Sequence, residues 1–111
     1  YTPRVDIKYR TGRIDVAISV DKKLLFVVEV KRSWNLSKTD KDVVKQAYVY
    51  SLEQGSRFVV ITNCDYYAVY DREMGNTIDS SFLFDFRITA LTKDDLKNIK
   101  SLHKVHFCEG I

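Results

Sequence analysis

Apolar and polar residues alternate along three successive segments near the start of the chain, residues 4–10, 13–20 and 24–31. An apolar residue at every second position is typical of a strand with one buried face. A Thr11-Gly12 turn separates the first two segments, and the polar residues 21–23 form a predicted loop before the third. The third segment is also apolar on its opposite face, at Leu25 and Val27, which indicates a central strand covered on both sides.

The pattern changes to helical spacing after a polar loop at residues 33–38. Apolar positions then recur every three or four residues, which predicts a helix that begins near Thr39 and ends at Gly55. Thr39 followed by Asp42 fits an N-cap with an acidic third residue.

Downstream of this helix, residues 57–62 and 66–70 are typical of strands, and a turn at residues 63–65 joins them. Alternating phenylalanines at 82, 84 and 86 indicate a short strand or a packing segment. Leu96, Ile99 and Leu102 lie at helical spacing behind a Thr92 cap, which predicts a terminal helix.

The order of these elements predicts one α/β (α+β) domain over residues 1–111. Three successive strands favour an antiparallel meander. The strand–helix–strand unit that follows favours a right-handed crossover to a parallel strand. We therefore expect a mixed central sheet flanked by helices.

Composition and charge narrow the classes of protein to consider. The chain has 111 residues, 45% hydrophobic and 30% charged, which suits one soluble domain and leaves no room for a helicase motor. The longest apolar run, residues 24–28, is far below the ~20 residues of a membrane span. Two cysteines without a CxxC motif predict reduced thiols, and we expect a cytoplasmic protein without a membrane partner. Residues 1–55 carry 11 Lys/Arg against 7 Asp/Glu, so an anionic partner would meet that half.

The apolar faces of the second and third strands determine how these strands pair. Ile18 must face Phe26 and Val16 must face Val28, because a slip of one residue would move every apolar side chain to the other face. With a three-residue loop, Val20 faces Leu24. The same register places Asp15 directly opposite Glu29.

Directly opposed residues have Cβ atoms ~5 Å apart, so these two carboxylates repel unless they share a proton or bind a cation. Lys31 lies on the face of Glu29, and the carbonyl of Val30 lies between them. Such oxygen donors suit Mg²⁺, and a lysine beside a metal-bound water suits phosphodiester hydrolysis. The alternative is an ordinary strand whose Glu29–Lys31 pair is solvated.

Asp15 followed by Glu29-Val30-Lys31 resembles the signature of the PD-(D/E)xK nucleases. Gln46 and Tyr50 resemble the Q-x3-Y element in the nuclease domain of type I restriction enzyme R subunits. The segments 58–63 and 67–71 resemble the strand pair after that helix, and the resemblance covers roughly residues 4–73. It implies a restriction-endonuclease-like αβββαβ core. The given sequence starts almost at the first strand, so the helix that precedes it in many members is absent or lies outside this sequence, and Ile14 stands where a proline is usual.

By this resemblance, Asp15, Glu29 and the Val30 carbonyl bind Mg²⁺, with Mn²⁺ as a substitute, and Lys31 assists the attacking water. It implies that Gln46 and Tyr50 support cleavage, which leaves 5′-phosphate and 3′-hydroxyl ends. Taken alone, Gln46 is equally an exposed helix residue and Tyr50 a core aromatic.

Basic residues around the acids predict a groove for a phosphate backbone. These residues are Lys8, Arg10, Arg13, Arg32, Lys38 and Lys45, and Trp34 is placed to stack or wedge at DNA. Each of them alone is more typical of a solvated surface. His103, His106 and Cys108 have loose metal spacing, but without a matching CxxC they do not favour zinc.

We therefore predict a Mg²⁺-dependent DNA endonuclease domain. The alternatives are a non-catalytic nucleic-acid-binding or subunit-docking module of the same fold, or a nuclease that acts on RNA or branched DNA. The expected partners are DNA and either a second copy in a homodimer or a helicase motor with specificity subunits, fused to or associated with the domain.

Overall fold

The computed structural model describes residue 2, residues 4–9 and residues 15–103, with only the backbone described for Tyr9, Asp15 and His103. The predicted mixed sheet is confirmed: six strands lie in the order β1-β2-β3-β4-β5-β6, with β3 and β4 parallel and the other neighbours antiparallel. The strands are β1 (Val5–Tyr9), β2 (Asp15–Val20), β3 (Lys23–Val30), β4 (Phe58–Thr62), β5 (Tyr66–Asp71) and β6 (Phe82–Arg87). The helices are α1 (Lys41–Gln54), α2 (Ile78–Ser81), the 3-10 turn η1 (Ile88–Ala90) and α3 (Lys93–His103). Among these helices, none is long and apolar enough to cross a membrane.

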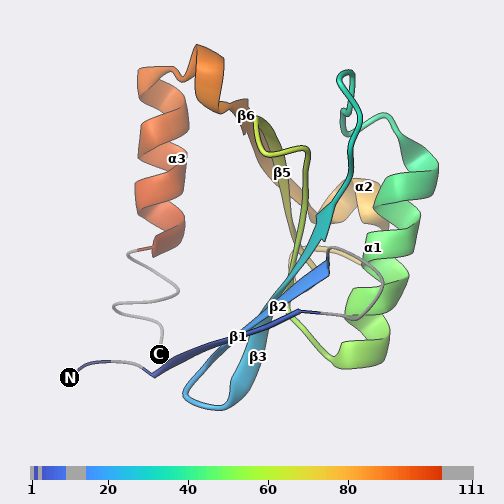
Figure 1. Cartoon of the computed structure of the whole chain (residues 1–111), viewed down its shortest axis with the longest axis vertical. Helices are drawn as coiled ribbons and strands as arrows, with labels where there is room; N and C mark the ends of the chain where they lie inside the picture. The colour runs from blue at the N-terminus through green and yellow to red at the C-terminus, as the bar shows by residue number, and fades with distance from the viewer. Residues whose placement is uncertain (1, 3, 10–14, 104–111) are drawn as a thin grey trace.

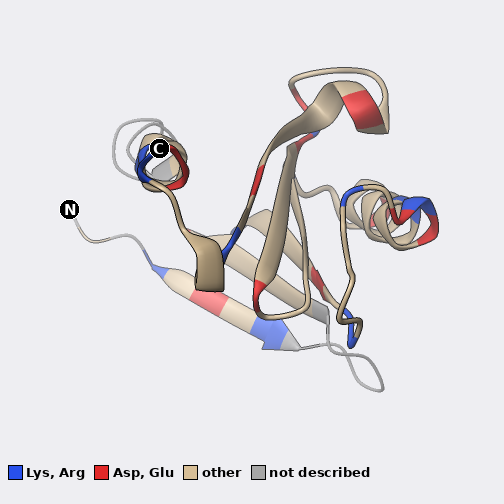
Figure 2. Cartoon of the chain, turned by 90° about the horizontal axis from the view of Figure 1, so that it is seen from above, with Lys and Arg blue, Asp and Glu red and all other residues tan. Residues whose placement is uncertain are grey.

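Helices lie on both faces of the sheet, with α1 on one side and α3 on the other (Figures 1 and 2). On the α1 face, the core includes Leu36, Val59 and Ile61, all fully buried, and α1 adds Val44 and Ala47. A second apolar cluster lies on the opposite face, where Leu102 of α3 contacts it. All five residues of β4 are buried, as expected for a strand covered on both sides.

The hairpin between β2 and β3 confirms most of the predicted register and corrects its end. Ile18 pairs with Phe26, but Val20 pairs with Lys23 rather than Leu24, around a two-residue turn at Asp21 and Lys22. Both turn residues have positive φ, 52° and 66°, as in a type I′ turn, whose twist matches that of the strands. A register shift after Ile18 takes up the extra residue, so the pairs beyond it stay in place.

Replacing Lys22 with glycine should raise the free energy of unfolding by about 0.5 kcal/mol, because glycine adopts this positive φ without strain at Cβ. The matched control is Lys23→Gly, which lies in extended β3 and should lower stability by about 0.5–1 kcal/mol. Urea denaturation measures both variants. A Lys22→Gly protein less stable than its parent would contradict the assignment of this turn.

The start of α1 is also corrected, since the helix begins at Lys41 with Asp40, not Thr39, at the N-cap position. The hydroxyls of Thr39 and Ser37 bond to each other, and the Asp40 carboxylate accepts the Ser37 N–H at 2.8 Å. These side chains stabilise the loop instead of capping the helix, and α1 has no side-chain cap hydrogen bond.

Where the structure describes them, the strands begin and end within one residue of their predicted bounds, whereas the predicted Thr11-Gly12 turn lies outside the described residues. Gly55 ends α1 in the left-handed conformation, and Thr92 accepts a hydrogen bond from the Asp95 N–H at the start of α3. The alternating phenylalanines form strand β6. The short helix α2 was not predicted, because four residues are too few to show a helical period.

Candidate active site

Glu29 and Lys31 lie at the end of the central strand β3, which pairs with β2 on one side and β4 on the other. The Glu29 side chain is only 1% exposed, and its Oε1 lies 3.2 Å from Nζ of Lys31, which is 33% exposed. Burying a carboxylate is costly unless it is paired. The ammonium of Lys31 therefore stabilises a buried negative charge while it remains open to solvent.

The predicted opposition of the two acidic residues is confirmed at the level of the backbone. Asp15 and Glu29 are Cα partners across β2 and β3. Glu29 is also level with Ile61 of β4, and Ile61 belongs to the core on the α1 face. Because partners across a ladder share a face, Glu29 belongs to the face of the sheet that α1 covers.

The two flanks of α1 lie beside different elements of the fold. Val44 and Tyr48 fall on one flank, and Gln46 and Tyr50 fall on the opposite flank. The Tyr48 hydroxyl lies 3.2 Å from the Ser81 hydroxyl, which joins the first flank to α2. Since α1 packs on β3 and β4 while α2 packs on β5, the exposed Gln46 and half-buried Tyr50 are turned toward the β2–β3 side.

The predicted basic residues fall into three places. Lys8 of β1 pairs with Ala17 of β2, which pairs with Val27 of β3, so Lys8 shares the face of Glu29 and is exposed. Arg32 is exposed directly after Lys31, whereas Lys38 and Lys45 line a hollow on the other flank of α1. Arg10 and Arg13 lie outside the described residues, as do His106 and Cys108.

Trp34 is 98% exposed at the tip of the loop between β3 and α1. The loop around it is anchored, because Leu36 is fully buried and the Asn63 side-chain amide donates to the Ser33 carbonyl at 2.8 Å. Further along, the Lys38 N–H donates to the Tyr66 hydroxyl at 3.0 Å. An exposed indole is thus held on a well-anchored loop.

A hollow of about 390 Å³ lies beside this indole and is lined by Arg32, Ser33, Trp34, Asn63 and Asp65. The sequence pattern predicts Asn63 and Asp65 only as turn residues. Both residues follow β4, which is parallel to β3, and ligands often bind at the carboxyl ends of parallel strands. This position in the sequence could therefore have indicated a binding site. The backbone N–H of Thr89 donates a hydrogen bond to the Asp65 carboxylate, and this bond makes the largest contribution to holding the pKa of Asp65 below its usual range.

The donor chemistry at Glu29 suits a hard divalent cation. The predicted set, the carboxylates of Asp15 and Glu29 with the Val30 carbonyl, consists only of oxygen donors, which Mg²⁺ prefers. In the part of the chain that the structure describes, no group of three or more His, Cys, Asp or Glu residues is placed to hold a metal ion. The ligand set therefore stays a prediction.

Comparison with protein families gives a match over most of the chain. The family model described as Type I restriction enzyme R protein N terminus (HSDR_N) matches residues 3–77, more than half of the chain. This range covers β1 to β5 with α1 and extends to Thr77, the residue before α2. No curated protein matches the chain.

Proposed function

The chain belongs to the family of type I restriction enzyme R protein N termini, and from that premise we propose that it is a Mg²⁺-dependent DNA endonuclease domain. The observation that supports this most directly is the buried Glu29 carboxylate paired with Lys31 and level with Asp15. A charged pair inside a sheet is costly for stability alone, so its presence favours a functional role.

In this proposal each of the candidate catalytic residues has a defined role. Asp15, Glu29 and the Val30 carbonyl hold Mg²⁺, which when bound supplies Lewis acidity and lowers the pKa of water. Lys31 places a positive charge at the attacking water and the scissile phosphate. The water oxygen forms the new bond to phosphorus, the P–O3′ bond breaks, and the 3′ oxygen takes up a proton.

Residues around this centre position the DNA. Gln46 and Tyr50 support cleavage from the flank of α1 turned toward β2 and β3. Lys8 and Arg32, with the predicted Arg10 and Arg13, contact backbone phosphates, and these contacts orient DNA without reading its sequence. Lys38 and Lys45 lie on the other flank of α1, so they are not part of this proposed DNA path.

Plasmid nicking tests this function. The parent protein should nick supercoiled DNA with Mg²⁺ or Mn²⁺ and stop in EDTA, and Lys31→Gln should reduce the rate about 100-fold or more. Lys97→Gln removes an exposed charge from α3 and should cleave like the parent. Equal cleavage by Lys31→Gln would refute the site, and salt-dependent binding without cleavage would favour the non-catalytic alternative.

Trp34 gives a separate readout of DNA binding, because it is the only tryptophan in the chain. We expect duplex DNA to quench its fluorescence in EDTA, where no cleavage occurs, as the indole stacks on a base. Trp34→Ala should weaken binding roughly 10-fold, while Trp34→Phe retains most of the affinity. Unchanged fluorescence at saturating DNA would place Trp34 outside the interface.

Membership of this family also suggests which protein subunits the domain works with. We propose that the domain works in a multisubunit restriction enzyme, beside a helicase motor and specificity subunits. Cleavage of both DNA strands needs two active sites, which a homodimer or two copies in one assembly would supply.

A further inference from the structure

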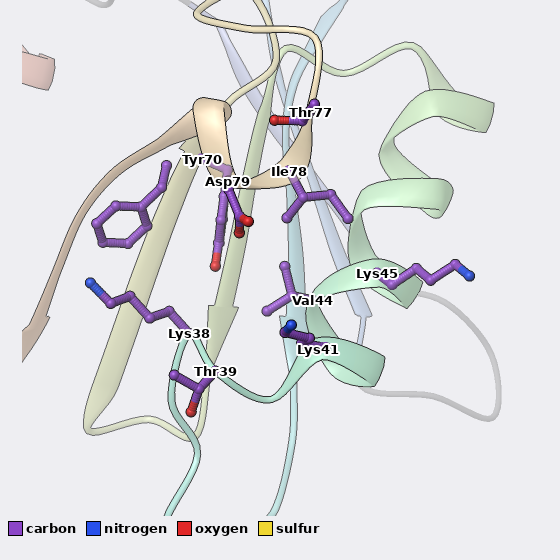
Figure 3. Close-up of a pocket in the computed structure, with 10 residues that line it drawn as sticks. Lys38, Thr39, Lys41, Val44, Lys45, Tyr70, Thr77, Ile78 and Asp79 are labelled. Carbon is purple, nitrogen blue, oxygen red and sulfur yellow. The ribbon is translucent and has the colours of Figure 1, made fainter.

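A second hollow, of about 520 Å³, lies between α1 and α2 on the flank of α1 opposite Gln46 and Tyr50 (Figure 3). Its volume falls in the range of about 300–1,000 Å³ typical of small-molecule sites. Neither Glu29 nor Lys31 lines it, so it is separate from the candidate active site.

Positive charge gathers at one end of this hollow. Figure 3 shows Lys38, Thr39 and Lys41 along the lower side of the hollow, where the Lys38 side chain extends away from Lys41, whereas Lys45 points away along α1. Nζ of Lys38 lies 4.4 Å from the centre of the Phe82 ring, which holds the ammonium at the edge of the apolar floor. Lysines in this arrangement are point charges suited to a phosphate.

The start of α1 adds to this positive end. Lys41 is the first residue of the helix and lines the hollow. The carboxylate of Asp40 is bonded to the Ser37 N–H and makes no cap hydrogen bond to α1. The helix dipole favours an anion here, but the carboxylates of Asp40 and Asp42 reduce its effect, so the lysines supply most of the positive charge.

The opposite wall comes from α2 and has the opposite character. Asp79 is directed toward the side of the lysines, with Val44 and Ile78 beside it, whereas Thr77 lies at the far end of the hollow (Figure 3). A carboxylate accepts hydrogen bonds from amino or hydroxyl groups. The hollow thus combines cationic, apolar and acidic groups.

Tyr70 lies against the floor, where its ring packs edge-on to that of Phe82 at 5.6 Å. Figure 3 shows its hydroxyl directed toward the side of Lys38 and Thr39. Burial, with smaller effects of Asp79 and Asp85, raises the pKa of Tyr70 to about 12. The hydroxyl therefore stays protonated at neutral pH and can donate a hydrogen bond to a phosphate oxygen.

We propose that this hollow binds a nucleoside monophosphate unit. Its phosphate lies at Lys38 and Lys41, its flat base packs on Val44 and Ile78, and an amino or sugar hydroxyl group donates to Asp79. Inorganic phosphate would use only the cationic end, and a purely apolar ligand would leave the lysines unused. The unit is either a free nucleotide or the 5′-phosphorylated end of a single strand.

Calorimetric titration in EDTA tests this proposal with dAMP, deoxyadenosine, inorganic phosphate and a short single strand with or without a 5′-phosphate. We expect dAMP to bind at least ten times more tightly than deoxyadenosine or phosphate. Tighter binding of the 5′-phosphorylated strand identifies a strand end, and binding of dAMP alone identifies a free nucleotide. No binding of dAMP or of the phosphorylated strand up to about 10 mM overturns the proposal.

Matched variants locate the site. The double variant Lys38→Gln/Lys41→Gln should bind dAMP at least tenfold more weakly than the parent, and so should the single variant Asp79→Asn. All three side chains are exposed, so the variants should fold. Lys97→Gln, on α3, should bind like the parent. Lys31→Gln should lose cleavage and keep dAMP binding, which separates this proposal from the nuclease function. Parent-like binding by the pocket variants refutes it.

Discussion

Replacing Glu29 with glutamine should reduce metal-dependent DNA cleavage by about 100-fold or more while the chain remains folded. The substitution keeps the volume of a side chain that is 1% exposed, but it removes the negative charge held 3.2 Å from Lys31. The neutral amide is a poor ligand for Mg²⁺ compared with a carboxylate. Initial rates of plasmid nicking over a Mg²⁺ titration measure the loss.

Glu53→Gln is the matched control for this experiment. Glu53 lies on the same domain, in the last turns of α1, and is exposed, so its replacement should leave cleavage unchanged. Circular dichroism and thermal unfolding verify that both variants fold. A folded Glu29→Gln protein that cleaves like its parent would show that this carboxylate does not belong to the active site.

The largest effect on stability is expected at Arg57. Its guanidinium donates two hydrogen bonds of 3.0 Å to the carboxylate of Asp71, which is 2% exposed, and this contact raises the pKa of Arg57. Arg57→Gln would leave the Asp71 charge buried without its cation. We expect a loss of about 3 kcal/mol in the free energy of unfolding, or roughly 10–20 °C in Tm.

Arg4→Gln provides the comparison, because Arg4 pairs with Asp6 at the surface, where the two side chains are 69% and 40% exposed. Its loss should cost less than about 1 kcal/mol. Thermal and urea unfolding of both variants measure the difference. Equal losses would mean that the burial of Asp71 does not set the strength of its ion pair.

The sequence alone determined the strands, their order and the opposition of Asp15 to Glu29. Local periodicity carries this information, because a one-residue slip would turn Val16 and Ile18 away from the core. It did not determine the end of the same hairpin, where a type I′ turn and a register shift move Val20 onto Lys23. The twist of the paired strands determines the type of turn and the register at this end of the hairpin, and twist leaves no periodic pattern in the sequence.

Only the tertiary structure decided what surrounds these residues. Glu29 is buried because α1 returns over β3 and β4, and that packing joins segments far apart in the chain. The hollow between α1 and α2 depends on a four-residue helix whose position is set by contacts with β5 and α1. Periodicity shows which face of a strand is apolar, but burial and cavities depend on which distant segment covers that face.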